Sequence, residues 1–248
     1  MAHPFEVRKE FELEATPEQI WEAIATGPGI DAWFLGSTNE VEPRLGGTVL
    51  LDFGDAAGES TVTAWDPPHR FAHESAAAPD GTLHAFEYVI EARDGGRAVV
   101  RLVHSGFLAD DWEAEYDAVN EGDLMYLHLM AQYVMHFRGR RATVISVWRP
   151  DEPDRDRALA IFRSALGLPA AVTEGLPVQV SPHGLEPIQG VVDFVSRGII
   201  GVRTDDALYR FLHTPQNVAF LGHHIYRDDI DPPMAKQAWQ AWLDRSFA

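Results

Sequence analysis

Two histidines are the residues of this chain whose type and placement could carry proton chemistry. His84 and His104 occur in two neighbouring runs of mostly alternating residues, 82–92 and 97–107. An imidazole titrates near neutral pH, so either side chain could polarise a carbonyl group or accept a proton. The alternative interpretation is a core histidine that is hydrogen-bonded to a helix residue or to water. No Ser–His–Asp order and no pair of carboxylates can be assigned around them, and we therefore assign no catalytic residue.

The register between the two runs can be predicted from the loop that joins them. A three-residue hairpin loop of Asp94, Gly95 and Gly96, with one glycine in the left-handed region, places Arg93 opposite Arg97. Counting outward then gives these pairs: Ile90 with Val100, Tyr88 with Leu102, and Phe86 with His104. In this register the apolar residues of both strands share one face with the histidines. A two-residue loop would break that agreement.

The elements that must position this face follow an α+β order. Residues 5–13 alternate like a half-buried strand. The run "TPEQIWEAIATG" predicts a helix in which Thr16 is the N-cap, Pro17 the first residue and Gln19 the partner in a capping box. Further strands are expected at 48–53, 60–65, 70–74, 82–92 and 97–107. We interpret "WDPPHRF" as a tight turn between two of them, because proline cannot donate to a strand ladder.

A long helix is expected at residues 112–137. Its apolar stripe has spacings of three and four and consists of Tyr116, Asn120, Leu124, Leu127, Ala131 and Val134. A curved antiparallel sheet wrapped around this last helix would bury both apolar faces and leave a pocket between them.

Five stretches of the first half resemble a known family when they are taken together and in order. They are "ATPEQIWEAIATGPGIDAWFLG", "RLGGTVLLDFG", "VTAWDPPHRFAHE", "VRLVHSGF" and "WEAEYDAVNEG…YLHLMAQYV". They resemble the START-like, helix-grip (SRPBCC) superfamily, in the branch homologous to the C-terminal domain of the activator of heat-shock-protein-90 ATPase. The resemblance implies a curved sheet gripping a C-terminal helix around a cavity. Members bind lipids, sterols or polyketides, cyclise polyketides, or act as co-chaperone domains, and no universal catalytic motif can be carried over.

The second half repeats the order of the first in a shorter form. The run "QGVVDFVSRGIIGVRTDDALYRF" parallels "GGTVLLDFGDAAGESTVTAWDPPHRF", and "GHHIYRDD" stands where "VHSGFLADD" stood. The counterpart of the strand at 82–92 is missing from this comparison. We therefore predict a helix-grip domain at 1–139 and a degenerate second helix-grip domain at 140–248. The alternative is an unrelated helical and β extension.

The face of the paired strands and the expected helices define a set of candidate cavity residues. The set is Trp33, Phe34, His84, Phe86, Tyr88, Leu102, His104, Trp112, Tyr116, Asn120 and Leu127. Simple core packing is the alternative role of its aromatic members. In a helix-grip fold the two roles overlap, because the pocket is an incompletely filled core.

Several classes of partner are excluded or disfavoured by composition. The formal net charge of -18 disfavours nucleic acid and anionic membrane surfaces. No leader-like or membrane-spanning apolar run is seen, and there is no cysteine, so we expect a cytoplasmic protein without membrane insertion. His223 and His224 are adjacent on an expected strand and point to opposite faces, so no metal is expected. The glycine pairs lack phosphate-loop spacing, and no cofactor is expected.

Three functions remain after these exclusions. The first is noncatalytic binding of a small hydrophobic or amphipathic ligand, such as a lipid or a polyketide-like molecule, between the sheet and the long helix. The second is a chaperone-associated protein-interaction module, with self-association also possible. The third is a cyclase or hydratase type of enzyme that uses His104 with Tyr88 or Tyr116 as proton carriers.

Overall fold

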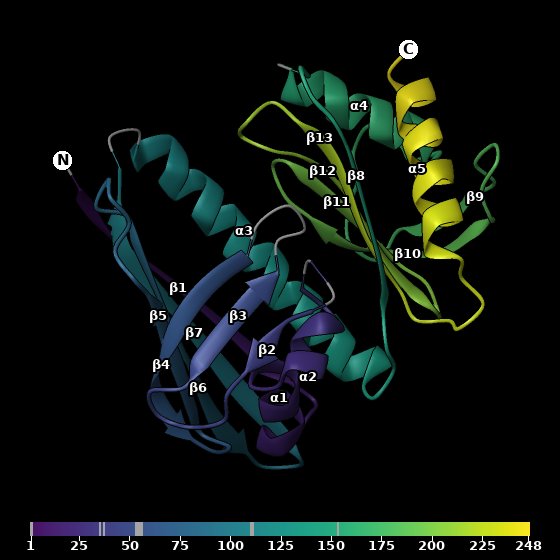
Figure 1. The fold of residues 1–248 in the computed structure, drawn as a ribbon. Helices are drawn as coiled ribbons and strands as arrows, with labels where there is room; N and C mark the ends of the chain where they lie inside the picture. Colours follow the sequence, from purple (N-terminus) through teal and green to yellow (C-terminus); the bar gives the residue numbers. More distant parts are fainter. Residues whose placement is uncertain (1, 35, 37, 53–56, 110–111, 153) are drawn as a thin grey trace. The chain divides into compact units, whose positions relative to one another are not determined.

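The chain folds into two compact units, each with its own antiparallel sheet (Figure 1). The computed structural model describes residues 2–34, 36, 38–52, 57–109, 112–152 and 154–248. Unit 1 comprises Met1–Arg140 and unit 2 comprises Arg141–Ala248. The predicted α+β class is confirmed, because helices and two antiparallel sheets make up the described part of the chain.

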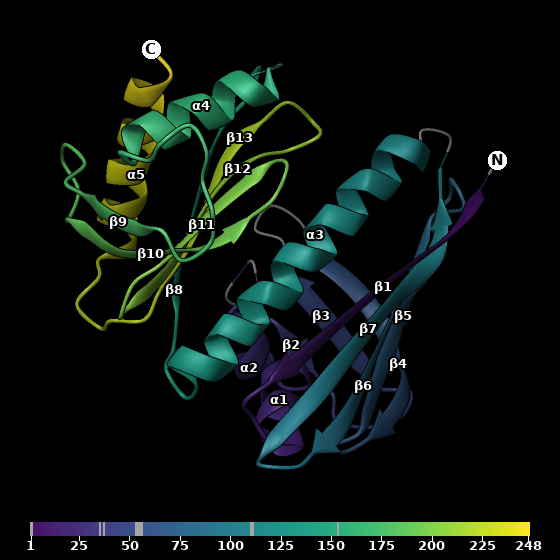
Figure 2. The same cartoon turned by 180° about the vertical axis from the view of Figure 1, so that it is seen from behind.

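Unit 1 is a seven-stranded sheet that faces one long helix. Its elements are β1 (His3–Leu13), α1 (Pro17–Ile24), α2 (Gly27–Asp31), β2 (Glu40–Val41), β3 (Thr48–Asp52), β4 (Ala57–Asp66), β5 (Arg70–Ser75), β6 (Leu83–Arg93), β7 (Arg97–Leu108), α3 (Trp112–Gln132) and the π-helical turn η1 (Tyr133–Phe137). The sheet order is β1-β7-β6-β5-β4-β3-β2, so the first strand pairs with the last. Figures 1 and 2 both show α3 running over one face of this sheet, with α1 and α2 near its C-terminal end.

The predicted hairpin register is confirmed. Arg93 pairs with Arg97, and Phe86 pairs with His104. Both loop glycines have positive φ, 79° at Gly95 and 75° at Gly96, which a residue with a Cβ rarely adopts. The other predicted strands are present, and their ends differ from the prediction by a few residues. The strand expected at 48–53 was predicted to end at residue 53, which lies outside the described residues.

The start of α1 shows why these residues form a helix at that point. Pro17 is its first residue, where no backbone N–H is needed. The Thr16 N–H donates to Oε1 of Gln19 at 3.0 Å, as the capping-box pattern predicted. The long helix also begins and ends as expected, because α3 begins at Trp112 and continues directly into η1.

Unit 2 has a similar topology with one strand fewer. Its elements are β8 (Thr143–Arg149), α4 (Arg155–Ala165), β9 (Pro177–Val180), β10 (Ile188–Val195), β11 (Ile199–Arg203), β12 (Ala207–His213), β13 (Ala219–Ile225) and α5 (Pro232–Ser246). The sheet order is β8-β13-β12-β11-β10-β9, so the first and last strands pair here too. We propose that unit 2 is a shortened second helix-grip domain.

The missing strand of unit 2 is not the one that the sequence comparison indicated. That comparison set β12 against β5 and left no counterpart for β6. However, β12 runs antiparallel to β13, whereas β5 and β7 both pair antiparallel with β6 and therefore run parallel to each other. Removing an internal strand from a meander would reverse the direction of its neighbours. Counting along the sheet from β13, β12 takes the place of β6, and the strand that has no counterpart is the edge strand β2.

Aromatic rings between α5 and the sheet form part of the core of unit 2. Trp239 and Trp242 on α5 are buried, and both rings contact the ring of Phe211 on β12. Asp231 caps α5 as predicted, since its Oδ1 accepts from the Met234 N–H at 3.0 Å.

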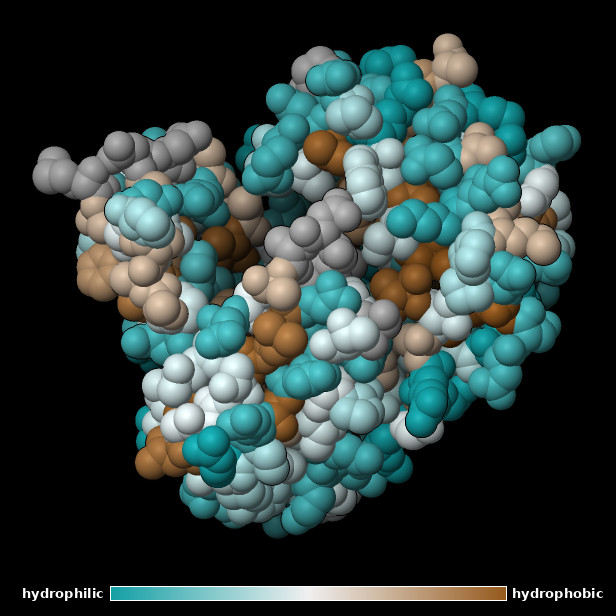
Figure 3. Space-filling model, viewed as in Figure 1, coloured by the Kyte–Doolittle hydropathy of each residue, from teal (hydrophilic) through white to brown (hydrophobic). Residues whose placement is uncertain are grey.

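Hydrophilic residues cover most of the face of the molecule drawn in Figure 3, and apolar residues occur there in small separate groups. Within the described residues, none of the helices combines the length and the apolar character that crossing a membrane requires.

Candidate functional site

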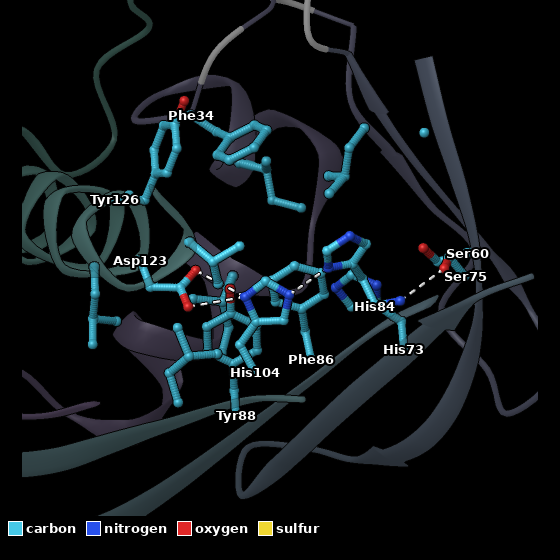
Figure 4. Close-up of a pocket in the computed structure, with 18 of the residues that line it drawn as sticks. Phe34, Ser60, His73, Ser75, His84, Phe86, Tyr88, His104, Asp123 and Tyr126 are labelled. Atoms are coloured by element: carbon cyan, nitrogen blue, oxygen red, sulfur yellow. Dashed lines mark hydrogen bonds and ion pairs between the residues drawn. The ribbon is translucent and has the colours of Figure 1, made fainter. Parts of the chain in front are cut away.

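A cavity of about 460 Å³ lies in unit 1 between the sheet and α3 (Figure 4). Its lining is mostly apolar and comes from β3 to β7, from α1, from α2 and the turn after it, and from α3. The lining residues are Ile24, Ile30, Trp33, Phe34, Leu51, Gly58, Glu59, Ser60, Phe71, His73, Ser75, His84, Phe86, Tyr88, Leu102, His104, Ala118, Val119, Gly122, Asp123, Tyr126 and Leu127. A volume of this size is in the range of small-molecule sites.

Three rings on adjacent strands form one wall of the cavity. His73 on β5 is opposite Phe86 on β6, which is in turn opposite His104 on β7. Residues directly opposite on one face have neighbouring side chains, so these rings stack. The centroids of His73 and Phe86 are 5.1 Å apart, and those of Phe86 and His104 are 3.9 Å apart.

A chain of hydrogen bonds runs from α3 through two imidazoles. Nδ1 of His104 lies 2.9 Å from Oδ2 and 3.1 Å from Oδ1 of Asp123. Nε2 of His104 lies 2.9 Å from Nδ1 of His84. His104 and Asp123 are buried, with 4% and 8% of their surface exposed, and burial strengthens each interaction in this chain. Figure 4 shows the three groups in line along the sheet side of the cavity.

The opposite wall is built from the segment after α2 and from α3. The indole Nε1–H of Trp33 donates to the backbone oxygen of Ala23 at 2.9 Å, which fixes the buried ring against α1. The Phe34 ring contacts that of Tyr126 on α3, with centroids 4.6 Å apart. Aromatic rings therefore lie on both sides of the cavity.

Burial sets the protonation of the titratable groups in this wall. It lowers the pKa of His73 to about 4, with a smaller contribution from the nearby His104, so His73 is neutral at pH 7. Burial also lowers the pKa of His84, and His104 adds to that effect while Asp123 opposes it. The pKa values of Tyr88 and Tyr126 are raised by burial, so both remain phenols.

The structure brings most of the sequence-predicted candidates together. The residues of that set that line the cavity are Trp33, Phe34, His84, Phe86, Tyr88, Leu102, His104 and Leu127. Their role in ligand binding stays a prediction. The remaining three line another part of unit 1: Trp112 and Tyr116 pack against the cluster of Phe5, Val7 and Leu108, and Asn120 accepts a hydrogen bond from Nζ of Lys9 at 2.6 Å.

Of the four candidates predicted on α3, Leu127 lines the cavity, whereas Trp112, Tyr116 and Asn120 do not. A helix that contacts both β1 and the cavity has two inward faces, and helical spacing alone does not say which one meets the cavity. The residues missed there are Asp123 and Tyr126, and on β5 His73 was also missed. A buried histidine needs a partner, so an acid near the middle of α3 was the available signal.

The two adjacent histidines of unit 2, His223 and His224, lie in its packed interior. His223 is fully buried against Trp239, with ring centroids 4.3 Å apart, and its pKa is lowered by burial to about 3. Among the described residues, no group of three or more His, Asp or Glu side chains could hold a metal ion.

Comparison with known protein families gives a match within unit 1. Residues 14–135 match the family described as Activator of Hsp90 ATPase homolog 1-like protein. Unit 1 is therefore similar to this family. The match covers strands and helices of unit 1 from the end of β1 to η1, and so includes the whole cavity lining. No curated protein matches the chain as a relative.

Three solved structures similar to this chain differ in how much of it they cover. The Aha1 dimer from Colwellia psychrerythraea is 20% identical, with a TM-score of 0.46, over 54% of this chain and 99% of that one. CalU16 from Micromonospora echinospora is 17% identical, with a TM-score of 0.40, over 54% and 86%. DynU16, described as a protein in the dynemicin biosynthetic locus, is 15% identical, with a TM-score of 0.46, and its match covers 97% of this chain and 95% of its own.

Proposed function

We propose that unit 1 binds a small hydrophobic or amphipathic molecule in the cavity between the sheet and α3, without converting it. The observation that supports this most directly is the cavity itself, a space of about 460 Å³ in the position where unit 2 packs rings. An interior of this size lowers stability unless it is filled, since side chains that line it lose contacts. A ligand would restore those contacts.

An enzymatic function with His104 as the proton carrier is less well supported. Both ring nitrogens of His104 lie within hydrogen-bonding distance of protein atoms, one on Asp123 and one on His84. A general acid or base must reach the reacting group itself. His104 therefore has the position of an internal link, which agrees with the interpretation of a core histidine bonded to a helix residue.

The family name points to a second candidate, an interaction with a chaperone. The resemblance to this family does not by itself distinguish binding at the surface from binding in the cavity. A pull-down of the Hsp90 chaperone followed by its ATPase assay tests this candidate directly. We rank it second because the cavity is a feature of this chain's own structure.

Native mass spectrometry of the purified chain, followed by a thermal-shift screen of fatty acids, sterols and aromatic compounds, tests ligand binding. A ligand present at a hundred times its Kd is expected to stabilise unit 1 by about 3 kcal/mol. The blocked variant Gly122→Leu places a side chain in the cavity, and Ala114→Leu is the matched control on the exposed side of α3. Binding that survives in Gly122→Leu would show that the ligand lies elsewhere.

A further inference from the structure

The hydrogen-bond chain determines which kind of atom faces the cavity. A carboxylate can only accept hydrogen bonds, so Nδ1 of His104 carries the proton that binds Asp123. In the neutral form of His104, Nε2 offers a lone pair, and Nδ1 of His84, 2.9 Å away, donates to it. Neutral His84 therefore has no proton on Nε2. In this neutral state the buried carboxylate orients both rings, as an acid does in other histidine relays.

The free nitrogen of His84 is directed at the interior of the cavity. Figure 4 shows the His84 ring with one edge toward His104 and the other toward the side of the cavity on which Phe34 lies. The backbone N–H of His84 donates to Oγ of Ser75 at 3.1 Å, which holds this part of β6 in place. A hydrogen-bond acceptor in a mostly apolar space selects a ligand with one donor.

We propose that the ligand is a neutral aromatic hydroxyl compound, a phenol or a planar enol, whose O–H donates to Nε2 of His84. This inference rests on the proposed ligand-binding function and names its ligand class. The rings of Phe34, Tyr126 and Phe86 give the flat part of such a molecule aromatic surface on both walls.

Charged ligands fit the same site less well. A carboxylate would meet a lone pair on His84 and the negative charge of Asp123 behind it. An ammonium group would have to lose its water in a mostly apolar cavity. Both oxygens of Asp123 already bind His104, and Glu59, the other carboxylate among the described lining residues, is exposed to solvent. A phenol donates a hydrogen bond from its hydroxyl to a matched acceptor and has no charge to desolvate.

The same chain can move a proton without leaving an isolated charge. The ligand O–H bond breaks as its proton binds Nε2 of His84, and the Nδ1 proton of His84 passes to Nε2 of His104. His84 is then neutral again and donates from Nε2 to the ligand phenolate. The positive charge is on His104, next to the carboxylate of Asp123 at 2.9 Å. Charge and protons balance, and the site stabilises a hydroxyl that is acidic enough to ionise.

Binding of para-nitrophenol and of its methyl ether, para-nitroanisole, to the full chain tests this inference. The two probes share a ring, and only the first has an O–H. We expect the phenol to bind about tenfold more tightly, the value of one hydrogen bond of about 1.4 kcal/mol. Its absorption spectrum is expected to show a larger ionised fraction when bound than when free at the same pH.

Three variants make the result specific to the chain. His84→Phe is expected to remove the preference for the phenol while retaining binding of the ether. Asp123→Asn is expected to lower the ionised fraction of the bound phenol. His69→Phe makes the same change at an exposed histidine in the turn before β5 and is expected to behave like the unmodified protein.

Two outcomes would overturn the inference in distinguishable ways. Equal affinity for the phenol and the ether in the unmodified protein, or tighter binding of para-nitrobenzoate or para-nitrobenzylamine, refutes the ligand class but leaves cavity binding intact. No binding of either probe, with an unchanged signal in the blocked variant Gly122→Leu, refutes the cavity function and the ligand class together. Neither conclusion depends on the folding of His84→Phe, since the two probes are compared in the unmodified chain.

Discussion

Gly122 provides the sharpest test that the cavity is a real and functional space. It lies in the interior of α3 and lines the cavity, and a Cβ built onto it would have no atom within 4 Å. Glycine in a helix interior is about 1 kcal/mol less favourable than alanine, because it loses more backbone entropy. We therefore expect Gly122→Ala to raise the free energy of unfolding of unit 1 by about 1 kcal/mol. For a unit of this length that corresponds to a rise in Tm of roughly 3 °C.

The larger variant Gly122→Leu separates stability from function. Leucine has nearly the helix propensity of alanine, and its side chain would enter the open space. We expect a protein at least as stable as the original that no longer binds ligand. A site that is kept open at a cost in stability is typical of function.

Chemical unfolding of the full chain, monitored by fluorescence and circular dichroism, measures the effect. Gly139→Ala is the matched control, because a Cβ would also meet nothing within 4 Å there, but the backbone has a φ of 79°. Alanine in that conformation costs about 1–2 kcal/mol, so the same substitution is expected to destabilise. If Gly122→Ala lowers stability as Gly139→Ala does, the space beside Gly122 is not open and the reasoning is wrong.

Three further predictions concern buried polar groups. Arg210→Met is expected to destabilise unit 2 by about 3–5 kcal/mol, because it removes the cation that pairs with the buried carboxylate of Asp193, 2.8 Å from Nη2. Denaturant unfolding would show a smaller loss if Asp193 is changed to Leu as well. His73 has a pKa of about 4 in the folded chain, against an ordinary value of 6.5. Between these two pH values the unfolded state binds more protons than the folded state. The free energy of unfolding should therefore fall by roughly 3 kcal/mol in total as the pH drops from 6.5 toward 4. Urea midpoints at several pH values measure this loss, and His73→Phe should lack it. Trp33→Phe removes the donor to the oxygen of Ala23 and should cost about 1 kcal/mol; a Tm equal to that of the unmodified chain would contradict the assigned hydrogen bond.

The parts of the fold that depend on neighbouring residues were predicted from the sequence. The register of β6 and β7 follows from a glycine loop and from alternation, and it places Phe86 opposite His104 without any knowledge of the rest of the chain. The start of α1 follows from Thr16 and Gln19, three residues apart. Such patterns are local, because the period of a strand or a helix assigns each side chain to a face.

Contacts between distant segments decided what the sequence left open. Asp123 looks like a solvent-exposed acid on a helix, and only the packing of α3 over β7 places it beside His104. The pairing of Arg210 with Asp193 is likewise invisible in the pattern of either strand, since a charge is buried only where its partner is present. The strand missing from unit 2 also required the pairing directions, because a short motif does not record which way a strand runs. Local periodicity thus determined which face of each element is apolar, while the position of buried charge was determined by tertiary structure, because its free energy depends on a partner from elsewhere in the chain.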